Sequence, residues 1–155
     1  MQAFPNAQSM ANADISEIFE LIKTCSYPNS KAQHLQQMAA MLCTNYGGDV
    51  PTTFDELIKL PGVGRKTANV MISVAFGQQA IAVDTHVFRV SARIGLTVDA
   101  KTPFEAEQQL TQGFSKQNWS RAHHWLILHG RYVCKALKPQ CNKCGLADVC
   151  KDAQH

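Results

Sequence analysis

Leu60-Pro61-Gly62-Val63-Gly64-Arg65-Lys66-Thr67-Ala68-Asn69 is the stretch of this chain that decides its fold. It is a glycine-rich turn that runs directly into a helical pattern. A capping signal in front of it, Thr53-Phe54-Asp55-Glu56, predicts a short helix over residues 53–59. The apolar periodicity behind it predicts a second helix over residues 65–76. The two helices and the turn between them form a helix-hairpin-helix.

The chemistry of this turn suits an anionic partner. Glycine at positions 62 and 64 lets the backbone approach a phosphate closely, and the N–H groups of Gly62, Val63, Gly64 and Arg65 can face it at the positive end of the helix dipole. Lys66 stands in the first helical turn, where the dipole disfavours an ammonium group and so favours a nucleophilic neutral amine. The alternative is an ordinary turn between two helices, in which the glycines only cap the first helix.

The rest of the chain also shows helical periodicity, which predicts an all-α fold. Further helices are expected over residues 15–22, after Ser30, from Thr102-Pro103 onward, and over residues 85–95 and 120–136. Gly47-Gly48, Gly77 and Gly95 are expected to end helices. No alternating strand pattern of useful length is present. We expect a helical domain over residues 1–100, and C-terminal helices with a cysteine loop over residues 101–155.

Composition narrows the class of protein. The 155 residues are 45% hydrophobic and 17% charged, which is typical of a globular domain with a core, and no apolar run is long enough for a membrane span. The first residues have neither the basic start nor the apolar stretch of a signal peptide, so we expect a cytoplasmic protein with reduced thiols. The net charge of +3 is small, but residues 115–151 carry seven Lys and Arg against the single acid Asp148. This basic stretch suits phosphates, although a solvated helix face would look the same.

Asp84 is the second candidate catalytic residue. It lies 18 positions after Lys66 and immediately precedes the helical stretch 85–95, which is the place of an N-cap. A carboxylate held by backbone N–H groups stays ionised and fixed, and it can stabilise a developing cation. The two roles are compatible.

Four of the six cysteines are close together near the C-terminus. Cys134, Cys141, Cys144 and Cys150 have the spacing C-x6-C-x2-C-x5-C, which can enclose a compact metal centre. A [4Fe–4S] cluster is preferred to zinc, because zinc ribbons usually present two C-x2-C pairs and this segment has one. Cys25 and Cys43 fall within helical patterns and are expected to be packed apolar residues.

The histidines are interpreted as structural residues. His123, His124 and His129 lie on one expected helix without nearby acidic ligands, so we expect hydrogen-bonded packing residues there and no metal site. His86, two residues after Asp84, is expected to belong to a helix start.

Taken together, four segments resemble the endonuclease III family of the helix-hairpin-helix DNA glycosylase superfamily. They are Leu60-to-Asn69 with Lys66, the Ala82-Val83-Asp84-Thr85-His86-Val87-Phe88-Arg89-Val90 segment, His123-His124-Trp125-Leu126-Ile127-Leu128-His129-Gly130-Arg131, and the cysteine loop. The similarity extends from residue 1 to about residue 151.

The resemblance implies a bifunctional enzyme of base excision repair, working as a monomer at the nucleoid of a bacterial cell. It would flip an oxidised pyrimidine out of duplex DNA, attack the sugar C1′ with Lys66, and cleave 3′ of the abasic site by β-elimination. Asp84 would stabilise the sugar cation and help activate Lys66. The [4Fe–4S] cluster would be structural, shaping a loop whose Lys135 and Lys138 contact DNA phosphates.

One feature departs from the family pattern. The family has a further N-terminal stretch, with a helix and loop that contain Leu-Ser-Ala-Gln, and no counterpart to it is found here, so we expect an N-terminally truncated form with reduced activity. Two alternatives remain open. The adenine-mismatch glycosylase branch shares the hairpin, the aspartate and the cluster, but it has no lysine at position 66 and typically carries a further C-terminal domain. A non-catalytic DNA-binding remnant is the other.

Overall fold

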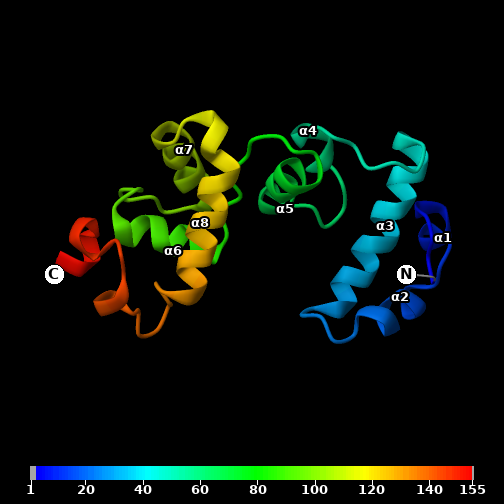
Figure 1. Cartoon of the computed structure of the whole chain (residues 1–155). Coiled ribbons are helices and arrows are strands. Elements are labelled where there is room, and N and C mark those ends of the chain that lie inside the picture. The colour runs from blue at the N-terminus through cyan, green and yellow to red at the C-terminus, as the bar shows by residue number, and fades with distance from the viewer. Residues whose placement is uncertain (1–2, 155) are drawn as a thin grey trace. The chain divides into compact units, whose positions relative to one another are not determined.

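The computed structural model describes residues 3–154, which are helical and contain no strand (Figure 1). The α-helices are α1 (Ala7–Ala11), α2 (Ile15–Ile22), α3 (Pro28–Tyr46), α4 (Phe54–Leu57), α5 (Arg65–Val70), α6 (Thr85–Ile94), α7 (Pro103–Gly113) and α8 (Trp119–Tyr132). Short 3-10 turns span Lys116–Asn118, Cys141–Lys143, Ala147–Val149 and Lys151–Gln154. The predicted all-α class is confirmed.

Most helices begin and end where local signals predict. Thr53 is the N-cap residue of α4, and the Thr102 hydroxyl oxygen accepts a hydrogen bond from the Glu105 N–H at the start of α7. Gly47 and Gly95 end α3 and α6 in the left-handed region, with φ of +62° and +94°. These ends are set by contacts within a few residues, which is why the sequence alone predicts them.

Three local expectations need correction. The helix expected after Ser30 begins earlier, at Pro28, because Tyr27 is left-handed (φ +55°) and proline fits the first helical position. The helix expected over 120–136 ends at Tyr132. Cys25 lies beyond the end of α2 and is exposed, so the prediction that it packs in a helix is wrong, whereas Cys43 is half-buried within α3.

The helix expected over residues 65–76 changes its type midway. The α-helix α5 continues as a π-helical turn over Met71–Ala75, and the Phe76 N–H donates to the Met71 carbonyl five residues earlier. Single π-helical turns inside α-helices occur frequently at functional sites. In the sequence, this π-helical turn lies between Lys66 and Asp84.

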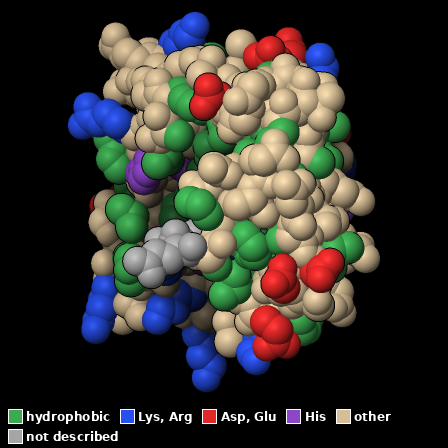
Figure 2. All heavy atoms as spheres, turned by 90° about the vertical axis from the view of Figure 1, so that its right-hand side faces the viewer, with side chains coloured by type: hydrophobic (Ala, Val, Ile, Leu, Met, Phe, Trp, Pro, Cys, Tyr) green, Lys and Arg blue, Asp and Glu red, His purple; other side chains and the backbone are tan. Residues whose placement is uncertain are grey.

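The chain divides into two compact units between Gly64 and Arg65. In the N-terminal unit, α1 and α2 both pack on α3 around a small core of Ala13, Ile18 and Ala32. The Gln36 amide on α3 donates to the Ala13 carbonyl at 2.8 Å, which ties α3 to the turn between α1 and α2. Figure 2 looks onto the side that holds these helices, where apolar side chains reach the surface among charged ones.

The C-terminal unit has the larger core, which α6, α7, α8 and the extended segment before α6 share. Its buried side chains are Ile81, Val83, Val87, Val90, Ala106, Leu110 and Leu126. Gly130 lets α8 approach α6, since a Cβ at this position would lie 2.9 Å from a Val90 methyl carbon and 3.1 Å from the His86 Cβ. Among residues 3–154, no helix is both long and apolar enough to cross a membrane. The expected division of the chain into a domain over residues 1–100 and a C-terminal part over residues 101–155 stays a prediction.

Candidate active site and cysteine loop

The hairpin turn belongs to the N-terminal unit and closes with a hydrogen bond from the Val63 N–H to the Leu60 carbonyl at 3.0 Å. Gly62 has φ +77°, and a Cβ built on it would lie 2.8 Å from the His34 Cβ of α3. Both the backbone conformation and the close contact therefore require glycine at this position. Gly64 has no such neighbour, and both glycines are exposed.

Lys66 is the second residue of α5, and its side chain is exposed. The structure thus places it in the first helical turn, as the sequence predicts. The side chain of the preceding residue, Arg65, binds the Glu107 carboxylate of α7 through two hydrogen bonds of 2.8 and 2.7 Å. Neighbouring positions therefore have different surroundings, with an exposed amine beside a guanidinium that is already paired.

Asp84 is the N-cap residue of α6, as predicted. Its Oδ1 accepts hydrogen bonds from the N–H groups of His86 and Val87, both at 2.8 Å. The side chain is half-buried, so the carboxylate is fixed by the helix start yet reaches the surface of the unit. His86 belongs to the helix start, as expected, and its ring lies 3.3 Å from an Arg89 guanidinium nitrogen.

His123 on α8 is a buried histidine of the C-terminal unit. Its side chain is 4% exposed, and Nδ1 has no hydrogen-bond partner among the described residues. Burial lowers the pKa of His123, and a backbone hydrogen bond at Ala82 opposes that shift. The charge of Asp84 raises this pKa and the charge of Lys66 lowers it, both by less than burial does. The prediction of a packed histidine is confirmed for His123 but is wrong for His124, which is exposed and bonds the Ser120 carbonyl. The sequence offers no sign that one His123 nitrogen is left without a partner.

The four cysteines of the C-terminal motif line a single hollow. Cys134 follows the end of α8, Cys141 begins a 3-10 turn, and Cys144 and Cys150 each follow such a turn. All four thiols are free, and the rest of the wall is largely apolar. Among residues 3–154, no three His, Cys, Asp or Glu side chains are arranged to hold a single metal ion.

Hydrogen-bonding groups already surround these sulfur atoms. An Arg93 guanidinium nitrogen lies 3.6 Å from the Cys134 Sγ, and the Leu146 N–H donates to the Cys144 Sγ at 3.4 Å. His129 Nε2 lies 3.6 Å from the Cys144 Sγ, so this histidine borders the hollow. Sequence reasoning treated His129 as a packing residue and missed this position, since only the fold of the loop brings Cys144 back to α8.

Two arginines one helical turn apart on α6 hold the start of the cysteine loop. Arg89 donates to the carbonyls of Gly130 at 2.8 Å and Cys134 at 3.0 Å. Arg93 donates to the carbonyls of Lys135 at 2.8 Å and Ala136 at 3.2 Å. Carbonyls at the end of α8 that lack helical partners are thus satisfied by α6. Sequence reasoning did not identify either arginine, although their spacing of four on an amphipathic helix was a usable signal.

The two loop lysines proposed for DNA contact, Lys135 and Lys138, are both exposed. Lys138 adopts a left-handed backbone conformation with φ +54°, which turns the chain ahead of Pro139. The loop therefore presents cationic side chains to solvent between the end of α8 and the first of its 3-10 turns.

Comparison with known proteins agrees with this geometry. Residues 1–116 match the HhH-GPD superfamily of base excision DNA repair proteins. The chain is 44% identical to endonuclease III of Bacillus subtilis over 153 residues, which are 99% of this chain and 70% of that protein. The chain belongs to the endonuclease III family. Its family activity is that of a DNA glycosylase and abasic-site lyase in base excision repair.

Other members and solved structures agree. Endonuclease III of Rickettsia felis is 50% identical over 130 residues, 84% of this chain and 61% of that protein. A trapped covalent intermediate of an endonuclease III with DNA superposes with a TM-score of 0.94 at 43% identity, covering 99% of this chain and 72% of that one. A thermostable thymine-DNA glycosylase superposes with a TM-score of 0.82 at 25% identity, covering 96% of this chain and 70% of that one. The match with this chain therefore spans 70% of the length of the Bacillus subtilis protein and 61% of the length of the Rickettsia felis protein.

Proposed function

We propose that this chain removes oxidised pyrimidines from duplex DNA and cleaves the strand 3′ of the abasic site, with Lys66 as the nucleophile. The observation that carries the proposal is that the exposed Lys66 and the N-cap residue Asp84 lie at the starts of two helices of one unit. A hydrogen bond from the Asn69 amide to the Ile81 carbonyl joins the segments that carry them. An exposed amine and a fixed carboxylate are the groups that attack at a sugar carbon requires.

Each of the two residues has a distinct part in the proposed reaction. The neutral Lys66 amine attacks the sugar C1′, the bond from C1′ to the base breaks, and the base leaves with a proton. The bond from C1′ to the ring oxygen then breaks, the ring oxygen takes up a proton from solvent, and a protonated Schiff base forms between C1′ and Nζ. Removal of a proton from C2′ expels the 3′ phosphate, and hydrolysis of the Schiff base returns Lys66. The Asp84 carboxylate stabilises the positive charge that develops on the sugar.

DNA contact is assigned to the hairpin and to the cysteine loop. We infer that the backbone N–H groups at Gly62, Val63 and Gly64 face a phosphate, and that the exposed Lys135 and Lys138 contact the backbone elsewhere. The Arg65 backbone N–H is assigned to the same phosphate, whereas its guanidinium binds Glu107 and is assigned none. The protein acts as a monomer on DNA in the cytoplasm of a bacterial cell.

The four cysteines would hold a [4Fe–4S] cluster. Four free thiols around one hollow, with N–H donors at two of the sulfur atoms, are a donor set of the right kind. Such a cluster distributes its four thiolates over separate iron atoms, so it does not need ligands that converge on one ion. When bound, it would supply a rigid template for the loop, and no step of the proposed reaction passes through it.

Trapping of the Schiff base with borohydride on a duplex with an abasic site tests the proposal. The parent chain is expected to form a covalent adduct, and Lys66→Ala to form none while it still binds the duplex. Lys101→Ala, which replaces an exposed lysine just before α7, is the matched control and should trap like the parent. An adduct with Lys66→Ala would overturn the assignment of the nucleophile. Binding by the parent without any adduct would favour a DNA-binding protein without lyase activity.

A further inference from the structure

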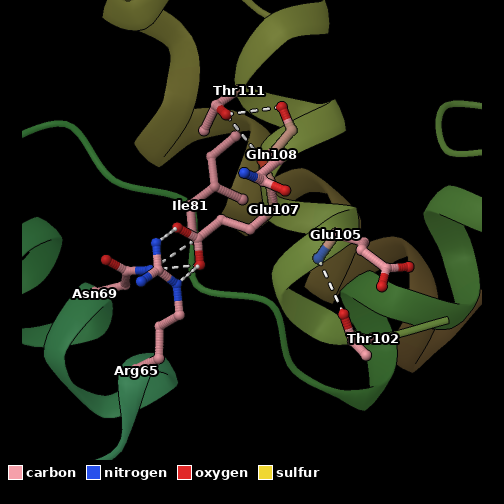
Figure 3. A network of polar contacts seen from close by, with 8 residues as sticks. All are labelled: Arg65, Asn69, Ile81, Thr102, Glu105, Glu107, Gln108 and Thr111. Atoms are coloured by element: carbon pink, nitrogen blue, oxygen red, sulfur yellow. Dashed lines mark hydrogen bonds and ion pairs between the residues drawn. The ribbon is translucent and has the colours of Figure 1, made fainter. Parts of the chain in front are cut away.

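A partly buried polar network joins the start of α5 to α7 (Figure 3). The Glu107 carboxylate accepts three hydrogen bonds. Two come from the Arg65 guanidinium, at 2.8 Å from Nε to Oε2 and 2.7 Å from Nη2 to Oε1. The third comes from the Asn69 side-chain amide at 3.0 Å. Two parallel bonds to one carboxylate fix the guanidinium in orientation as well as in distance.

Asn69 extends this network to a third segment. Its side-chain nitrogen also donates to the Ile81 carbonyl at 3.2 Å, so both amide hydrogens are used. Asn69 is 6% exposed, and its donors have these partners in place of water. A buried amide with two fixed partners holds the three segments in one arrangement.

The network lies within three residues, along the sequence, of each candidate catalytic residue. Lys66 directly follows Arg65 and precedes Asn69 by three residues, which is about one helical turn. Ile81 precedes Asp84 by three residues and belongs to the extended segment that leads into α6. Glu107 therefore binds both ends of the turn that carries Lys66, and Asn69 joins that turn to the segment that carries Asp84.

The surroundings make the ion pair more rigid than a surface pair. The Glu107 side chain is 13% exposed and that of Arg65 41%. The Arg65 guanidinium also lies over the Phe104 ring, 4.4 Å from its centroid, so α7 contacts both the charge and the face of the group. Removing one partner of such a pair leaves a partly buried charge without its counterion.

We propose that Glu107, Arg65 and Asn69 are positioning residues that set Lys66 relative to Asp84. The inference rests on the proposed function and extends it to residues that touch no reacting atom. Lys66 is exposed, so its own side chain is not held by packing, and the precision of its placement comes from the backbone of α5. Loss of the network should move that backbone by a fraction of an ångström to an ångström, which slows attack at C1′ while the DNA-binding surface stays in place.

The test is the single-turnover rate of adduct formation with excess enzyme, on an abasic duplex under borohydride, for Glu107→Gln. We expect this rate to fall about 10- to 100-fold. Affinity for a duplex with a tetrahydrofuran abasic analogue should stay within about twofold of the parent. So should the yield of adduct per enzyme in a second assay with duplex in excess, which counts the folded protein. A purely structural role would lower the yield, as part of the protein unfolds, and leave the rate of the folded fraction unchanged.

Glu105→Gln is the matched control, because it neutralises a carboxylate two residues away that accepts the Lys101 N–H and lies outside the network. It should leave the rate unchanged. If Glu107→Gln does not fold, Arg65→Lys decides, since it keeps the charge but cannot form both bonds. It should slow the reaction with affinity retained, to a smaller extent than Glu107→Gln. Parent-like rates in Glu107→Gln, or in Arg65→Lys where that variant decides, would overturn the inference. The proposed function fails on different results, namely no adduct with the parent or an adduct with Lys66→Ala.

Discussion

The two candidate sites of the C-terminal unit are held by different means. Lys66 and Asp84 stand at the starts of helices whose backbones are tied by an N-cap, by a buried amide and by a bidentate ion pair. The four cysteines lie beyond the last α-helix, on a loop of short 3-10 turns with many exposed residues. Direct contacts to α6, through Arg89 and Arg93, hold the start of this loop.

This contrast teaches how each site depends on its ligand. The lysine and aspartate are positioned by the protein's own hydrogen bonds, so their arrangement does not require substrate. The cysteine loop has a largely apolar wall and little secondary structure, so a bound cluster would contribute much of its stability. Changes in the loop should therefore act through cluster content, whereas changes near α5 and α6 should act on rate or on helix packing.

The largest expected effect is the loss of the cluster. Anaerobically purified parent protein should contain about four irons and four sulfides per chain. Cys144→Ser should lose most of this iron and weaken DNA binding, because the loop that carries Lys135 and Lys138 loses its template. Iron and sulfide analysis with a DNA titration measures both effects. Cys43→Ser, at a cysteine of α3 that does not line the hollow, is the control and should keep its iron. Stoichiometric zinc without iron in the parent would contradict the assignment.

The next effect separates the two roles of Asp84. Asparagine caps a helix about as well as aspartate, so Asp84→Asn should keep the stability of α6 while it slows base removal, by about 100-fold. Asp84→Ala should slow the reaction and also lower the free energy of unfolding by about 1 kcal/mol. Single-turnover excision and urea unfolding measure these quantities. If Asp84→Asn excises the base at the parent rate, the carboxylate is only a cap.

A smaller effect is expected where α8 crosses α6. Gly130→Ala places a Cβ 2.9 Å from a buried Val90 methyl carbon, so one helix must shift, and we expect a loss of about 1–3 kcal/mol of stability. Gly113→Ala at the end of α7 meets no atom within 4 Å and should be neutral or slightly stabilising. Urea unfolding of both variants makes the comparison. Equal stability of the two would show that α6 and α8 are not as tightly packed as described.

The smallest effect concerns pH. Burial lowers the pKa of His123 from the ordinary value of 6.5, so the unfolded chain takes up a proton more readily than the folded one. This contribution to stability is complete above pH 6.5 and is lost as the pH falls through the lowered pKa. His123→Gln should reduce the loss of stability between pH 7 and pH 5, and His34→Gln, at an exposed histidine of α3, should not. The urea concentration at the midpoint of unfolding, measured across this pH range, tests the prediction. If the stability of His123→Gln depends on pH as steeply as that of the parent, burial of His123 is not the cause of the loss.

Much of the fold could be predicted because its signals are local. Asp84 bonds the N–H groups two and three residues ahead of it, and Thr102 bonds the one three residues ahead. The left-handed ends at Gly47 and Gly95 depend likewise on a few neighbouring carbonyls. Tyr27 shows the limit of this reasoning, because a left-handed tyrosine is uncommon and nothing in the local pattern favours it over Ser30 as the residue before α3.

The sequence by itself therefore determined the helix starts and stops, the hairpin, the spacing of the cysteines and the resemblance to a family. Tertiary structure alone decided which distant groups meet. Arg65 finds its carboxylate 42 positions away, and Arg89 finds the Cys134 carbonyl 45 positions away. Local hydrogen bonds depend on a few dihedral angles that residue types favour, whereas these contacts depend on how whole helices pack, and packing is a sum over many side chains that no short pattern contains.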